Sequence, residues 1–189
     1  MKPNHPVTVQ DILRSFPCNK YTRIQILELA NEWGSQAITL PQAIEHICPK
    51  LKDTESRLWL ILRHPWYEDE DLITLARSYY EQLLTYAHVH NLTLDRLYTI
   101  MAETICLQGD IRREHLARIK DVDRHVKWFK SRPAQEVRAH MAARACRWAL
   151  FYSTNYDREQ ANVLCDMQYN ITITCNNNNN VQLTHMKEE

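Results

Sequence analysis

Apolar residues recur three and four positions apart along most of the chain, which is the spacing of an amphipathic α-helix. The clearest stripe follows the acidic residues 68–71 and predicts one long helix that ends near His90. Acidic side chains in the first turn favour a helix start there, because they interact with the positive end of the helix dipole. The buried stripe of this helix consists of Leu72, Leu75, Ala76, Tyr79, Leu83 and Ala87.

The segments before this helix predict shorter helices. A helix over residues 8–16 precedes a second one, which is capped near Tyr21 or Thr22 and runs to Trp33. Gly34 follows directly, and a glycine in this place is typical of a helix that ends in the left-handed conformation.

A third and a fourth helix are predicted from cap residues. Thr39 is placed to cap a helix with Pro41 in its first turn and Pro49 at its end. Asp53 is placed to cap the next helix, in which residues 58–62 are apolar nearly all round. That pattern predicts a helix enclosed by its neighbours at the centre of the core.

After His90 the same spacing predicts further helices. Thr93 is placed to cap one of them, and residues 111–129 form the next. A helix that starts after Pro133 would face the 111–129 helix in the antiparallel sense, and a last helix covers residues 157–167. The predicted buried face of the helix after Pro133 consists of Val137, Met141, Ala145, Trp148 and Tyr152.

The C-terminal end breaks the helical pattern. Residues 169–174 alternate between polar and apolar and predict a lone strand, either an edge or an arm. Residues 176–189 lack core-forming side chains and predict a disordered or extended tail. The predicted fold is therefore all-α: an orthogonal or antiparallel bundle of about eight or nine helices with a short extended segment and a flexible polar C-terminal tail. Residues 1–168 form its helical domain, with short helices over 1–63 and long ones over 66–168, and residues 169–189 form the tail.

Composition excludes several function classes. The chain has 2 glycines in 189 residues, so a phosphate-binding loop rich in glycine is excluded. Because there is no apolar run near eighteen residues and no secretory leader pattern, we expect a cytosolic protein that does not enter membranes. The 6 cysteines are irregularly spaced without a CxxC pair, which favours buried, reduced thiols. No Glu-x-x-His motif is present, and the sequence predicts no metal, no cofactor and no catalytic group.

Net charge is zero, but the charges are unevenly distributed. Residues 109–150 contain eleven Lys or Arg and five acidic residues, which leaves +6 there and −6 over the rest of the chain. This asymmetry predicts an interaction surface in the second half, and the partner would present an acidic face. The predicted contact residues are Arg112, Arg113, Lys120, Arg124, Lys127, Trp128 and Lys130. The same residues also fit a nucleic-acid backbone, with Trp128 available for stacking, although acidic residues interrupt the basic stripe.

Several segments together resemble a helical family of immunity proteins encoded by bacteria and some phages. They include Pro17-Cys18 followed by Tyr21-Thr22, the stretch Arg57-Leu-Trp-Leu-Ile-Leu-Arg63, the helix from Leu75-Ala76 to Leu84, Gln108-Gly-Asp110 with Leu116, and the alanines at 139, 142, 143, 145 and 149. The resemblance implies a protein without enzymatic activity that binds and neutralises a toxin or a defence effector. It carries over no catalytic residue. A nucleic-acid-binding protein that uses residues 110–150 is the alternative, and the oligomeric state stays open.

Overall fold

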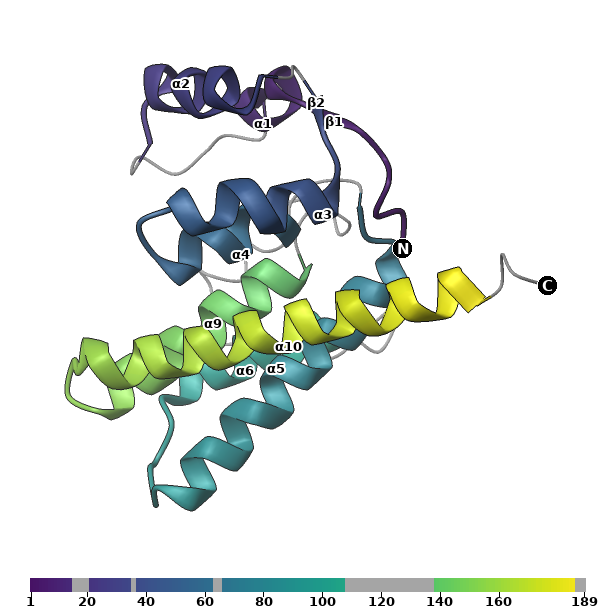
Figure 1. Ribbon diagram of the computed structural model, residues 1–189. Helices are drawn as coiled ribbons and strands as arrows, with labels where there is room; N and C mark the ends of the chain where they lie inside the picture. Colours follow the sequence, from purple (N-terminus) through teal and green to yellow (C-terminus); the bar gives the residue numbers. More distant parts are fainter. Residues whose placement is uncertain (15–20, 35–36, 63–65, 108–137, 186–189) are drawn as a thin grey trace.

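The computed structural model describes residues 1–14, 21–34, 37–62, 66–107 and 138–185, and it is an all-α bundle (Figure 1). This confirms the predicted fold class. The elements in chain order are β1 (Val7–Thr8), α1 (Val9–Arg14), α2 (Arg23–Trp33), β2 (Ala37–Ile38), α3 (Leu40–Gln42), the π-helical turn η1 (Ala43–Ile47), the 3₁₀ turn η2 (Cys48–Lys50), α4 (Thr54–Leu62), α5 (Asp69–Val89), α6 (Arg96–Cys106), α9 (Arg138–Ser153) and α10 (Arg158–His185).

The helices form three tiers in Figure 1. α1 and α2 lie at one end, and α3, η1 and α4 form the middle tier. The long helices α5, α6, α9 and α10 make up the third tier, in which α9 packs against the other three. β1 and β2 pair antiparallel, with Val7 opposite Ile38 and Thr8 opposite Ala37. This short ladder joins the first tier to the second, and the sequence pattern did not predict it.

Local capping contacts fix the ends of the short helices. The Thr22 hydroxyl oxygen accepts the Gln25 N–H at 3.2 Å, and the Gln25 side-chain oxygen accepts the Thr22 N–H at 2.9 Å. Gly34 ends α2 with φ at 72°, the left-handed value that favours glycine. Thr39 precedes α3, with proline in its first turn. The predicted cap at Thr22, the end at Gly34 and the start after Thr39 are confirmed. The single helix expected from Thr39 to Pro49 is instead divided into α3, η1 and η2, and Pro49 lies inside η2.

α4 lies at the centre of the core, as its apolar sequence predicts. Leu58, Ile61 and Leu62 are 0–1% exposed and belong to the same buried cluster as the apolar residues of α5 and α9. Asp53 Oδ1 accepts the Ser56 N–H at 2.8 Å at the start of this helix. The whole predicted stripe of α5, from Leu72 to Ala87, is buried as well.

Two predictions about the third tier are wrong in detail. Asp95 caps α6 in place of Thr93, and its Oδ1 accepts the Tyr98 N–H at 3.2 Å. α9 turns its alanines inward, while Met141 and Trp148 are only half-buried and Tyr152 is exposed. Small side chains allow a helix to approach several neighbours closely, so the alanine face was selected over the face with larger apolar side chains. The buried residues of this face include Ala139, Ala142, Ala143, Ala145, Cys146, Ala149 and Leu150.

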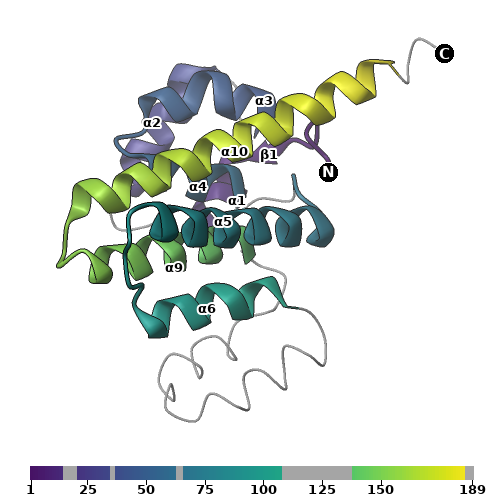
Figure 2. The same cartoon turned by 90° about the horizontal axis from the view of Figure 1, so that it is seen from below.

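The C-terminal prediction is also wrong for residues 169–185. α10 continues through the expected strand and tail to His185 and crosses the middle and long-helix tiers (Figure 2). A polar stripe one turn apart faces inward: Gln168, Thr172 and Asn176 are 0–2% exposed. The Tyr79 hydroxyl donates to Thr172 Oγ1, and Tyr67 Oη donates to Asn176 Oδ1 at 2.8 Å. These contacts with distant parts of the chain favour the helix over the local alternation of residues 169–174.

Candidate interaction surface

The seven predicted contact residues, from Arg112 to Lys130, fall within residues 108–137. The predicted helix over 111–129, the turn at Pro133 and the stop at Gly109 fall there too. All of them lie outside the described residues, so the contact surface stays a prediction. The described part of the basic region begins at Arg138 and continues along α9 with Arg144 and Arg147.

Five aromatic rings gather beside these arginines. They come from α6, from one face of α9 and from the turn that follows α9, and we call them the aromatic cluster: Tyr98, Trp148, Phe151, Tyr152 and Tyr156. Tyr98 and Tyr152 stack with ring centroids 5.2 Å apart and an interplanar angle of 6°. Phe151 meets the edges of Trp148 and Tyr156 at centroid distances of 5.0 and 5.3 Å. Offset and edge-on pairs of this kind stabilise each other beyond the area they bury.

The cluster is open to solvent at the end of α9. Tyr156 is 65% exposed and Tyr152 is 37% exposed, while the other three rings are half-buried. Asn155 and Tyr156 both have left-handed backbone conformations, with φ at 54° and 71°. Asparagine adopts this conformation readily, whereas it costs roughly 1–2 kcal/mol for a residue such as Tyr156. The Tyr156 N–H donates to the Phe151 carbonyl at 2.9 Å and helps to hold this turn.

One carboxylate neutralises much of the positive charge nearby. The Arg147 guanidinium lies 5.8 Å from the Trp148 ring centroid and donates to Glu55 Oε2. Arg144 Nε lies 3.9 Å from Glu55 Oε1, and the Arg144 side chain is 48% exposed.

Burial raises the pKa of Tyr98, and the neighbouring Tyr152 raises it further, so this phenol stays protonated at neutral pH.

The cysteines in the described ranges are unsuited to nucleophilic chemistry. Cys48, Cys106, Cys146 and Cys165 are free and buried, as predicted, and Cys175 is free and half-buried. Burial raises the pKa of Cys48 and Cys106 to about 11 and that of Cys165 to about 12. Because the thiolate is the reactive form, these thiols are poor nucleophiles at neutral pH.

The part of the chain that the structure covers brings together no group of three or more His, Cys, Asp or Glu side chains able to hold a metal ion. His140 on α9 is buried, at 5% exposure. Among the helices that the structure describes, none has the length and apolar character needed to cross a membrane.

Sequence reasoning missed the aromatic cluster. It assigned Trp148 and Tyr152 to the buried face of their helix and gave Tyr98, Phe151 and Tyr156 no role. The signal was present in the spacing of residues 148, 151, 152 and 156, which places aromatic rings one turn apart. Comparison of the chain with protein-family models, with curated proteins and with solved structures finds no significant match. The resemblance to immunity proteins therefore stays a prediction.

Proposed function

We propose that this chain is a helical protein without enzymatic activity that binds and neutralises a toxin or a defence effector protein. The aromatic cluster is the observation that carries the proposal. Tyrosine, tryptophan and arginine are the residues most enriched where protein interfaces are energetically strongest. Here they gather at an exposed helix end beside a turn in which Tyr156 has a strained left-handed backbone, and strained backbone is found more often at functional sites.

The cluster suits a protein partner better than a nucleic acid. Stacking of bases requires open ring faces, but Tyr98 and Tyr152 already cover each other. Phosphate binding requires available cations, but Arg147 and Arg144 both lie against Glu55. The exposed rings of Tyr152 and Tyr156 can instead pack against a protein partner. The predicted basic residues from Arg112 to Lys130, which lie outside the described residues, would supply further contacts to an acidic face of the partner.

A capture experiment with matched variants tests the proposal. The tagged wild type, the double variant Tyr152→Ala/Tyr156→Ala and the control Ile24→Ala/Val89→Ala are each incubated with host lysate at low and high salt, with and without nuclease. Ile24 and Val89 are 67% and 66% exposed and belong to other helices. We expect the wild type and the control to retain the same protein after nuclease treatment, and the tyrosine variant to lose it.

The captured protein is then expressed in bacteria with each variant. We expect the wild type and the control to restore growth and the tyrosine variant to need at least tenfold more protein, since a hot-spot residue contributes about 2 kcal/mol or more. Equal protection by the tyrosine variant would refute the role of the cluster. Recovery of nucleic acid that is lost at high salt would favour the nucleic-acid alternative.

A further inference from the structure

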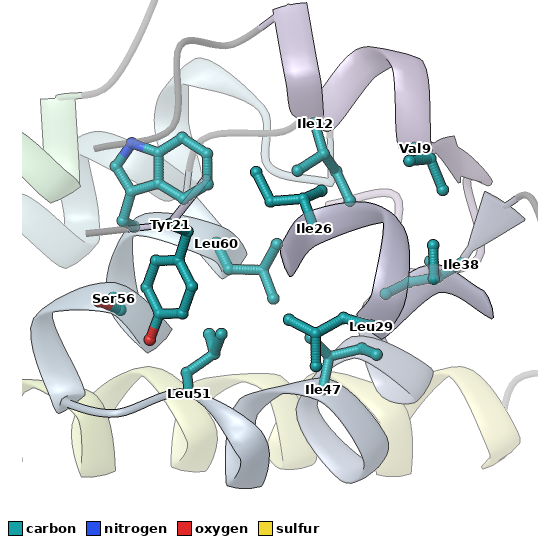
Figure 3. A pocket seen from close by; sticks show the side chains of 12 residues that line it. Val9, Ile12, Tyr21, Ile26, Leu29, Ile38, Ile47, Leu51, Ser56 and Leu60 are labelled. Atoms are coloured by element: carbon teal, nitrogen blue, oxygen red, sulfur yellow. The ribbon is translucent and has the colours of Figure 1, made fainter. Parts of the chain in front are cut away.

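An apolar pocket lies between the first and second tiers of the fold (Figure 3). It contains about 650 Å³ of space that no atom fills, including the part open to solvent. α1, α2 and β2 line one side, and η1, Leu51 and α4 line the other. The lining residues are Val9, Ile12, Tyr21, Ile26, Leu29, Ala30, Ile38, Ile47, Leu51, Ser56, Trp59 and Leu60.

The lining offers almost no polar group to a ligand. Ser56 Oγ donates to Asp53 Oδ1 at 2.9 Å. The Tyr21 hydroxyl accepts the Lys52 N–H at 2.8 Å. With the exception of the Trp59 indole, the remaining lining side chains are hydrocarbon. A charged or strongly polar group would lose its hydration in this pocket without replacement, so the buried part of any ligand must be apolar.

Polar contacts tie the two tiers together around the pocket. Lys50 Nζ lies 2.6 Å from Glu32 Oε2, which joins η2 to α2. The Lys52–Tyr21 hydrogen bond joins the same segment to the residue before the α2 cap.

A peptide segment would bring its own backbone N–H and C=O groups into an apolar pocket that cannot satisfy their hydrogen bonds. A slim hydrocarbon chain has no such requirement.

The half-buried apolar residues of the lining supply the driving force for binding an apolar ligand. Ile12, Leu29 and Trp59 line the pocket and are half-buried. A bound hydrocarbon would cover them, and removal of apolar surface from water is favourable in proportion to its area. We propose that this pocket binds the aliphatic chain of a small amphipathic molecule, with the chain inside and the polar end in solvent. The site is separate from the aromatic cluster and does not depend on the proposed function.

Titration with straight-chain carboxylates from hexanoate to decanoate tests this site. We expect affinity to rise about fourfold for each added methylene, the equivalent of roughly 0.8 kcal/mol. Decanol should bind with an affinity similar to that of decanoate, because the polar end makes no buried contact. In methyl NMR spectra, decanoate should shift the signals of Ile12, Ile26 and Leu29, while those of Leu83 and Leu164 in the long-helix tier stay in place.

Variants separate pocket binding from adsorption to the surface. Leu29→Trp and Ala30→Leu each add volume inside the pocket, and Ile24→Trp adds an indole at an exposed position of the same helix. We expect the pocket variants to weaken decanoate binding at least tenfold and the control to leave it unchanged, with circular dichroism showing that all three are folded. If the Leu29→Trp variant does not fold, decanoate binding by the Ala30→Leu variant tests the proposal. The proposal would be overturned if a folded pocket variant bound decanoate as tightly as the wild type does. It would also be overturned if affinity did not depend on chain length, or if decanoate bound and decanol did not.

Discussion

The hydrogen bond between Tyr67 and Asn176 offers a direct test of where the C-terminal helix lies. The sequence pattern predicts a polar tail at Asn176, whereas the structure buries this residue to 2% exposure against the start of α5. Tyr67→Phe removes only the donor hydroxyl, and Asn176→Ala removes the acceptor together with the rest of the amide. The two variants and their combination form a double-mutant cycle.

The expected magnitude follows from the surroundings of the bond. Tyr67→Phe leaves Asn176 Oδ1 buried without its donor, which costs about 1–3 kcal/mol. The Asn176 Nδ2 already lacks a hydrogen-bond partner, so no second contact compensates. Asn176→Ala should cost a similar amount, because Tyr67 is only 7% exposed and its hydroxyl would lose its acceptor. The double variant should be less destabilised than the sum of the single ones by about 1 kcal/mol.

Urea unfolding of the four proteins, followed by circular dichroism, measures these free energies. For a chain of this size each kcal/mol also corresponds to a shift in Tm of about 2–4 °C. Asn177→Ala is the matched control, since Asn177 is the next residue of α10 and is exposed; its effect should stay within about 0.5 kcal/mol. If all single variants unfold like the wild type and the coupling is near zero, Asn176 is not docked and our account of α10 is refuted.

Three further predictions concern the rest of the fold. Gly34→Ala should destabilise the protein by about 1–2 kcal/mol in urea unfolding, because φ is 72° there even though a Cβ would meet nothing within 4 Å; a neutral effect would contradict the assigned C-cap. Alkaline pH should lower the free energy of unfolding: burial raises the pKa of Cys48 and Cys106 from 9.0 to about 11, so the native state holds protons that the unfolded state releases. This stabilisation is complete below about pH 9 and is lost as the pH rises toward 11, and urea midpoints that do not change between about pH 8 and 10.5 would contradict it. Glu55→Gln should destabilise by about 1 kcal/mol or more, because it leaves the half-buried Arg147 without its carboxylate; a double-mutant cycle with Arg147→Gln that shows no coupling would refute this.

Helix boundaries could be predicted where the deciding contacts are local. The Thr22 cap and the Gly34 stop depend on residues no more than a turn away, and all of those residues are visible in the sequence. The apolar residues of α5 recur at helical spacing along the whole helix, so they define one buried face. Helix α10 could not be predicted this way, because Tyr67 and Tyr79, the residues that select the helix, are about a hundred positions away.

The candidate surface was harder to predict than the fold. Its apolar character alone predicted that Trp148 lies in the core, but α9 packs against α4, α5, α6 and α10, and only its alanine face fits there. Displacement of the larger rings to the opposite face is what creates the aromatic cluster. Side-chain volume, and not only apolar character, therefore decides which face of a crowded helix stays available to a partner.

The polar stripe of α10 also limits how this helix can be aligned along its length. The end of the helix contains five consecutive asparagines, a repetitive sequence with few features to distinguish one alignment from the next. A shift of one residue, about 1.5 Å along the helix axis, would bring Ile171 or Ile173 to the position of Thr172 against Tyr79. An isoleucine side chain cannot accept the hydrogen bond of the buried Tyr79 hydroxyl. The two tyrosine hydroxyls therefore exclude the alignments that place an apolar residue of α10 against them.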